Sequence, residues 1–226
     1  MTFPFPEVQG GHSAGVAAVP LSVDDSYFAL SNTDSASYTF TTGISPGEGD
    51  HVLILLATQN ISGDGAITNV QLDGNAVTTV VTEFSSSGET NMSAYLYEVG
   101  AGGLVNPDIT FDLANGSRRL SVVAYDVSGT MATGYKDHGA EDGATGDNSF
   151  DIDVDEGGIA IGLYWYWGSN SKRTLTGLTK DEDAVVSNVR CGNGHVDGLA
   201  NDDTYTVSCN NDNGQDNSIL FVVSFI

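Results

Sequence analysis

The stretch Ile67-Thr68-Asn69-Val70-Gln71-Leu72-Asp73-Gly74-Asn75-Ala76-Val77-Thr78 decides the fold class of this chain of 226 residues. Two alternating runs flank Asp73-Gly74-Asn75, and alternation of apolar and polar residues is typical of a strand with one buried face. Asp-Gly is also a preferred dipeptide for a tight hairpin turn, because its residues tolerate positive φ. The stretch therefore predicts a β-hairpin.

Similar strands follow one another at regular spacing on both sides of this hairpin, and no convincing helix lies between them. About a dozen short strands favour an all-β fold, namely a two-sheet β-sandwich of jelly-roll-like topology, over a barrel. The order of the strands stays open. The predicted strands are Tyr38–Thr42, His51–Thr58, Ile67–Leu72, Ala76–Phe84, Met92–Val99, Asp108–Leu113, Arg119–Val127, Ser149–Asp155, Ile159–Trp167, Thr174–Thr179, Ala184–Arg190, Asp203–Ser208 and Ser218–Ile226.

Two segments lack strand patterning. Residues 1–20 contain Phe3-Pro4-Phe5-Pro6 followed by small residues, a composition that favours extended backbone, so we expect an N-terminal arm that contacts either a neighbouring subunit or its own domain. Residues 21–226 are then expected to form a single β-sandwich domain. The stretch Ser128–Asn148 is rich in Gly and Asp, and we expect an exposed excursion between two halves of similar texture.

The net charge of the chain limits the classes of partner that it is expected to bind. Thirty Asp and Glu residues stand against seven Lys and Arg residues, which gives a net charge of −23. A polyanion of this kind repels nucleic acid and anionic lipid, and neither is expected as a partner. No window is long and apolar enough for a membrane span, and the first residues lack the pattern of a secretory signal.

Three sequence patterns are typical of a catalytic or binding site, and each also has a purely structural interpretation. Gly11-His12-Ser13-Ala14-Gly15 matches the G-x-S-x-G pattern of hydrolases, but no strand and helix are predicted around it, so no catalytic residue is assigned. Asp151, Asp153 and Asp155 alternate along one strand face and are weak calcium candidates, and a solvated strand face is the favoured interpretation. No other cofactor is expected, and the scattered histidines lack zinc spacing.

The third pattern is the aromatic run Tyr164-Trp165-Tyr166-Trp167. If exposed, Trp165 and Trp167 could stack on sugar rings, and the alternative is that they pack between sheets or subunits. Cys191 and Cys209 lie near predicted strands and could be cross-strand neighbours. Either a disulfide bond or two buried thiols fits them.

Several of these segments resemble β-sandwich virion proteins of tailed bacteriophages and related bacterial surface domains. The beginning of the chain is similar to the beginning of those proteins, at Met1-Thr2-Phe3-Pro4. A strand of theirs with the pattern "G-D-x-hydrophobic" is similar to Gly49-Asp50-His51-Val52-Leu53-Ile54. The hairpin 67–78 resembles their "V-T-S-V-T-Y-G-G-Q-A-L-T" type, and Tyr95-Leu96-Tyr97-Glu98-Val99 resembles their "L-Y-x-L" strand. The motifs are structural, and the acidity and the two cysteines depart from the pattern.

The resemblance implies a non-enzymatic viral structural protein located in the virion and assembled in the host cytoplasm. Its role would be capsid decoration or cement, or that of a head fibre, and its partners would be the major capsid protein, other virion subunits or further copies of the chain. Phe3, Pro4, Phe5 and Pro6 would form the subunit-binding arm. The alternative from another class is a carbohydrate-binding module or adhesin that uses Trp165, Trp167 and the acidic loops.

Overall fold

The computed structural model describes residues 19–59, 66–84, 90–114, 119–131, 135–143, 147–167, 173–211 and 218–226. Within these ranges every regular element is a strand, and no helix is long and apolar enough to cross a membrane. The strands are β1 (Ser22–Ser31), β2 (Ser37–Thr41), β3 (His51–Gln59), β4 (Ile67–Leu72), β5 (Asn75–Ala76), β6 (Thr78–Phe84), β7 (Thr90–Glu98), β8 (Asp108–Leu113), β9 (Arg119–Ser128), β10 (Tyr135–Gly143), β11 (Asn148–Val154), β12 (Ile159–Trp167), β13 (Arg173–Thr176), β14 (Thr179–Val186), β15 (Val189–Val196), β16 (Asp202–Asn211) and β17 (Ser218–Phe225).

These strands form four antiparallel sheets. The first half of the chain builds sheet A, in the order β1-β9-β3-β7-β6, and sheet B, in the order β2-β8-β4-β5. The second half builds sheet C, in the order β10-β17-β12-β15-β14, and sheet D, in the order β11-β16-β13. In each half the first strand pairs with the last and the last pairs with the third, as in a jelly roll. The predicted all-β sandwich is confirmed, and it occurs twice.

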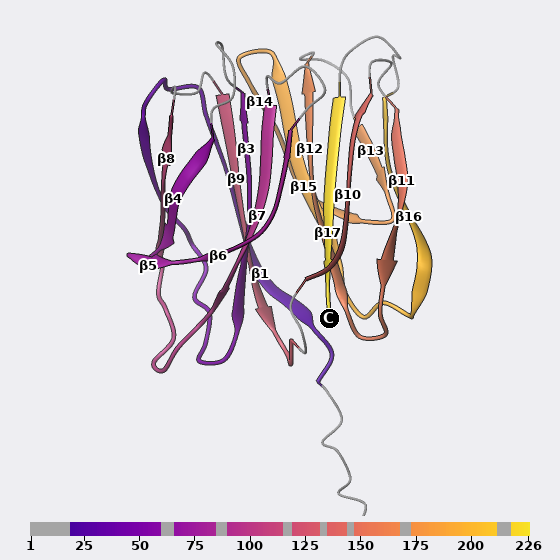
Figure 1. Cartoon of the computed structure of the whole chain (residues 1–226), viewed down its shortest axis with the longest axis horizontal. Coiled ribbons are helices and arrows are strands. Elements are labelled where there is room, and N and C mark those ends of the chain that lie inside the picture. Colours follow the sequence, from indigo (N-terminus) through magenta and orange to yellow (C-terminus); the bar gives the residue numbers. More distant parts are fainter. Residues whose placement is uncertain are drawn as a thin grey trace, which may run out of the picture.

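The sheets are stacked in the sequence B, A, C, D, from left to right in Figure 1. One apolar cluster lies between sheets B and A, a second between sheets C and D, and the largest lies between sheets A and C. We call sheets A and B the first sandwich, sheets C and D the second sandwich, and the contact between sheets A and C the A–C interface. The two inner sheets are therefore covered on both faces.

This stacking explains the two kinds of strand in the sequence. In β3, Leu53 and Leu55 point into the A–C interface, whereas Ile54 and Leu56 point toward sheet B, so the run Val52–Ala57 is apolar throughout. In β8, an outer strand, buried and partly exposed residues alternate strictly. A continuous apolar run is therefore typical of a central strand of an inner sheet, which is covered on both faces, and alternation is typical of a strand with one face toward water.

Two strands were missed by the sequence prediction, and they are the equivalent first strands of the two sandwiches. β1 carries the sequence SVDDSYFALS, and β10, YKDHGAEDG, lies inside the expected excursion Ser128–Asn148, so that expectation is wrong. Neither segment alternates, and each is held as a strand by its partner, β9 or β17. Pairing between distant segments overrides local propensity at these positions.

One tight turn was predicted correctly and another was missed. Asp73 and Gly74 have φ values of 49° and 78° and form the expected two-residue turn between Leu72 and Asn75. Ser187 and Asn188 form a second such turn, with φ values of 45° and 67°, in the middle of the predicted strand Ala184–Arg190. That prediction is wrong: the segment is the end of β14, the turn and the start of β15, and Asn188 is of a residue type that tolerates positive φ.

Candidate functional site

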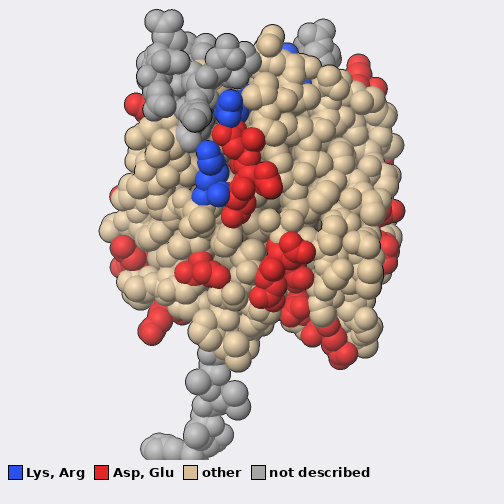
Figure 2. All heavy atoms as spheres, turned by 180° about the vertical axis from the view of Figure 1, so that it is seen from behind, with Lys and Arg blue, Asp and Glu red and all other residues tan. Residues whose placement is uncertain are grey.

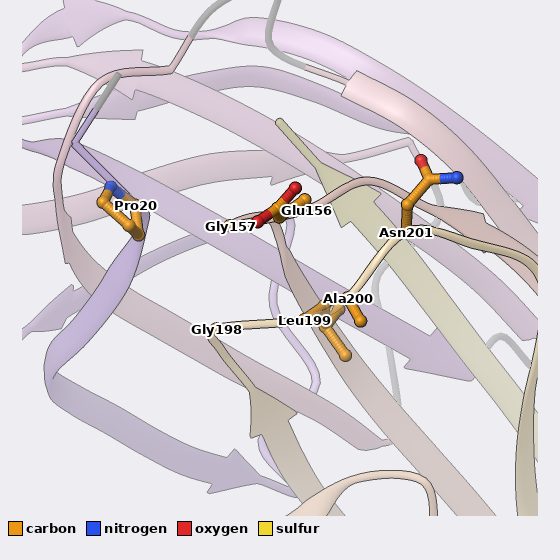
Figure 3. Close-up of a pocket in the computed structure, with 7 residues that line it drawn as sticks. All are labelled: Pro20, Glu156, Gly157, Gly198, Leu199, Ala200 and Asn201. Atoms are coloured by element: carbon orange, nitrogen blue, oxygen red, sulfur yellow. The ribbon is translucent and has the colours of Figure 1, made fainter. Parts of the chain in front are cut away.

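The N-terminal segment enters the folded part beside an open pocket of about 540 Å³. Figure 3 shows Pro20 of this segment on one side, Glu156 and Gly157 of the β11–β12 turn in the middle, and the loop after β15 on the other side. That loop contributes Gly198, Leu199, Ala200 and Asn201. We call this place the arm base.

Backbone hydrogen bonds connect the segments of the arm base. Leu21 N–H donates to the Gly157 carbonyl at 2.8 Å, and Gly157 N–H donates to the Leu199 carbonyl at 2.8 Å. On the other side, Thr130 N–H donates to the Val19 carbonyl at 3.0 Å. Leu21 is buried in the A–C interface, whereas Val19 is exposed. The chain is therefore anchored to the second sandwich immediately before it begins the first.

The predicted arm residues Phe3, Pro4, Phe5 and Pro6 lie outside the described residues, as does the G-x-S-x-G segment 11–15. The structure describes the chain only from Val19 onward. Val19 is exposed, and Pro20, the next residue, lines the pocket of the arm base.

Trp165 is fully buried in the A–C interface, opposite Cys191 on the neighbouring strand β15. A ring without exposed surface cannot stack on a sugar, so the glycan expectation for Trp165 is corrected in favour of packing between sheets. Trp167 pairs through its backbone with Val189, and its side chain lies outside the described residues.

The three calcium candidates do not form a common site. Asp151 is exposed and accepts a hydrogen bond from Thr206 Oγ1 at 2.6 Å. Lys136 Nζ lies 3.1 Å from Asp153 and 3.3 Å from Asp155, so an ammonium group neutralises this pair of carboxylates. Among the described residues no group of three or more His, Cys, Asp or Glu side chains is arranged to hold a metal ion. The calcium expectation is therefore corrected. Lys136 belongs to β10, which the sequence prediction missed.

Cys191 and Cys209 are not joined by a disulfide bond. Cys191 lies in the A–C interface, whereas Cys209 lies in the cluster between sheets C and D. Both are buried, and burial raises the pKa of the Cys191 thiol well above its ordinary value. The two residues are therefore not cross-strand neighbours, and they belong to different layers of the core.

Acidic side chains far outnumber basic ones. On the face drawn in Figure 2 they form two larger groups and several isolated spots, and basic side chains lie against the upper of the two groups. One ion pair lies on sheet C, where Arg190 Nη1 donates to both carboxylate oxygens of Asp183 at 2.7 Å. The surface outside such pairs presents negative charge, which disfavours close approach of anionic partners at low salt.

A polar network crosses the A–C interface, and sequence reasoning missed it. Tyr125 on β9 donates its hydroxyl hydrogen to Asp181 Oδ2 on β14 at 2.8 Å, and it accepts a hydrogen bond from Asn193 Nδ2 on β15 at 2.7 Å. His195 Nδ1 lies 2.8 Å from the same Asp181 oxygen. Burial, and then the charge of Asp181, raises the pKa of Tyr125 well above its ordinary value. Three strands supply these residues, so no spacing in the sequence indicates them.

The fold and these surfaces define an acidic protein made of two stacked jelly-roll-like sandwiches. No protein-family model matches the chain, and no curated protein sequence matches it. Among solved structures, the chain is similar to the crystal structure of the major capsid protein P2 from bacteriophage PM2. The TM-score is 0.28 and the identity 12%, over 89% of this chain and 97% of that chain. A TM-score of this size assigns neither a family nor a function.

Proposed function

We propose that the protein is a structural component of a bacteriophage virion and binds other virion subunits. Jelly rolls are a fold of viral capsid domains, and the chain contains two of them. Because jelly rolls also form lectins and cupins, the fold alone does not select this function. The sequence resemblance to phage virion proteins supports the same choice.

The arm base is the observation that carries the proposal. The chain is anchored there by hydrogen bonds on both sides of Pro20, and eighteen residues precede Val19. Eighteen extended residues reach about 60 Å, which is far enough to contact a neighbouring subunit. Phe3 and Phe5 would bury apolar surface against that neighbour, and the prolines would reduce the entropy lost when the arm is ordered.

Within the virion we propose a position on the capsid, as a decoration or cement protein or a head fibre, with the major capsid protein as the partner. Further copies of the chain are a second acceptor for the same arm. The acidic surface would face solvent and keep free subunits apart until the arm contacts are made.

Peptide mass spectrometry on purified particles tests the location, and the copy number relative to the major capsid subunit tests the position. Hundreds of copies per particle are expected for a decoration protein, and a few dozen or fewer for a fibre. Absence of the protein from particles would overturn the proposal.

Incorporation of arm variants tests the mechanism. We expect Phe3→Ala combined with Phe5→Ala to abolish or strongly reduce incorporation while the circular dichroism of the free protein is unchanged. Val8→Ala combined with Val16→Ala removes apolar groups from the same segment outside the Phe-Pro motif and serves as the matched control. Equal incorporation of both double variants would contradict an arm that binds through its phenylalanines.

A further inference from the structure

The three histidines in the described part of the chain all lie on the two sheet faces that meet in the A–C interface. Directly opposite residues in a sheet share a face, and each histidine is opposite a residue of the A–C core. These cross-strand pairs are His51 with Val127, His138 with Val223, and His195 with Ile161.

His138 connects the edge strands of the two inner sheets. Its Nε2 lies 2.7 Å from Glu83 Oε1, so β10 of sheet C is tied to β6 of sheet A. The hydroxyl of Tyr135 lies 2.6 Å from Nδ1 of the same ring and holds it in place. The imidazole and the carboxylate are both partly exposed, so a proton can reach the pair from solvent.

His195 lies in the second connection. Its Nδ1–H donates to Asp181 Oδ2, the oxygen that also accepts the Tyr125 hydroxyl hydrogen from sheet A. The side chains of His195 and Asp181 are 22% and 14% exposed, so this pair is partly shielded from water and salt while remaining accessible to protons. His195 and Asp181 both belong to sheet C, and the His195 ring packs edge-on against the Tyr125 ring of sheet A, with the ring centroids 5.7 Å apart.

We propose that the A–C interface is a proton-responsive joint, in which protonation of His195 strengthens the contact between the two sandwiches. A proton taken from water turns the neutral imidazole into a cation that faces the Asp181 carboxylate and lies against the Tyr125 ring of the opposite sheet. Hydrogen bonds between charged partners are roughly twice as strong as neutral ones, and more so where water is partly excluded. The inference concerns the joint itself and does not depend on the virion role.

The charges around the His195 ring agree with this direction. Asp181 and Asp197 face His195, and the hydrogen bond to Asp181, with these charges, raises its pKa despite partial burial. The stability that this proton contributes is full below the ordinary histidine pKa of 6.5 and is lost as the pH rises through the raised value.

His51 acts in the opposite direction. Burial lowers its pKa although Glu98 and Asp50 are close, and its Nδ1 is buried without a hydrogen-bond partner. A proton on His51 would therefore weaken the interface at acidic pH. His51→Gln removes this opposing contribution, and we expect it to steepen the pH response of the joint.

Hydrogen exchange of the β14 peptides tests the proposal, measured at about pH 5.5 and about pH 8, on either side of the histidine range, and corrected for the intrinsic exchange rate. We expect the opening equilibrium of β14 to be several-fold smaller at the lower pH, up to about tenfold if the pKa of His195 differs by one unit between the closed and open states. Asp181→Asn should abolish this response.

Glu182→Gln is the matched control, because it removes the same charge from an exposed position next to Asp181 and should leave the response unchanged. An unchanged response in Asp181→Asn, or none in the wild type, would overturn the proposal. If this variant is too unstable for exchange measurements, an NMR titration of the His195 ring in the wild type decides. A pKa that does not lie above 6.5 contradicts the joint.

Discussion

Tyr125 and Asp181 join the two sandwiches through a partly buried hydrogen bond of 2.8 Å, although 56 residues separate them in the sequence. Tyr125 comes from β9, next to the centre of sheet A, and Asp181 from β14 at the edge of sheet C. The bond therefore runs across the layers rather than within a sheet. Its partners would be left unsatisfied inside the protein if either residue were removed.

Tyr125→Phe should lower the free energy of unfolding by about 1–3 kcal/mol, because it removes one hydroxyl group and leaves Asp181 and Asn193 each without one buried partner. Urea denaturation measures the change. Tyr27→Phe is the control: Tyr27 packs against the first sandwich core, and we expect a change within about 0.5 kcal/mol. Equal losses in the two variants would show that the network contributes nothing beyond ring packing.

Asp126 is the residue outside the A–C interface whose pKa most clearly predicts a pH-dependent stability. It is 5% exposed, and burial, together with the charges of Asp50, Asp24 and Asp25, raises its pKa from 3.8 to about 6. The native state holds this proton more tightly than the unfolded chain, so its contribution to stability is full below pH 3.8 and is lost as the pH rises through about 6.

Asp126→Asn should therefore raise the free energy of unfolding by about 1–2 kcal/mol at neutral pH and have little effect near pH 4. Denaturation curves across this range measure both limits. Asp34→Asn, at an exposed position, should change stability equally little at both pH values. A gain for Asp126→Asn that does not vary with pH would contradict the raised pKa.

Lys136→Met should lower the melting temperature of the protein at low salt, because Asp153 and Asp155 would lose the ammonium group that lies between them. The loss should shrink in high salt, since counterions screen the repulsion between the two carboxylates. Thermal denaturation at two salt concentrations measures this. Lys180→Met, which removes a contact of 3.4 Å to a single carboxylate, should have the smaller effect, and the reverse order would count against the prediction.

Gly129→Ala should disturb the arm base. Gly129 has a φ of 112°, and an added Cβ would press on the carbonyl oxygen of Pro20. Gly198→Ala is the matched control, because Gly198 also has a positive φ, of 61°, but open space around a new Cβ. We expect a loss of about 1 kcal/mol from backbone strain alone in the control and at least twice that in Gly129→Ala. Similar losses in urea denaturation would show that the contact with Pro20 is easily relieved.

Strand prediction succeeded where the sequence pattern reports burial directly. Ile159–Trp167 was predicted with its observed bounds, since a long apolar run is a strand covered on both faces. The pattern could not show which layers cover it, so Trp165 was considered for a surface site although it is wholly internal. The division at residue 20 between an arm and one domain stays a prediction.

The candidate sites were less predictable than the strands. The calcium face was assigned without β10, and Lys136 on that strand neutralises two of its three carboxylates. The Tyr125 network and the His138 pair draw on strands far apart in the sequence, and neither has a linear motif. The residues of both are brought together only by the stacking of sheets A and C.

The sequence by itself determined the class of this fold: its alternating and continuous apolar runs specify strands, its Asp-Gly turn specifies a hairpin, and its charge specifies an acidic surface. These are local properties, set by side-chain period and backbone φ. Only the tertiary structure decided that the strands form two stacked sandwiches, that β1 and β10 are strands, and that Tyr125 meets Asp181. Such pairings depend on which distant segments bury each other's surface, and a single sequence window does not contain that information.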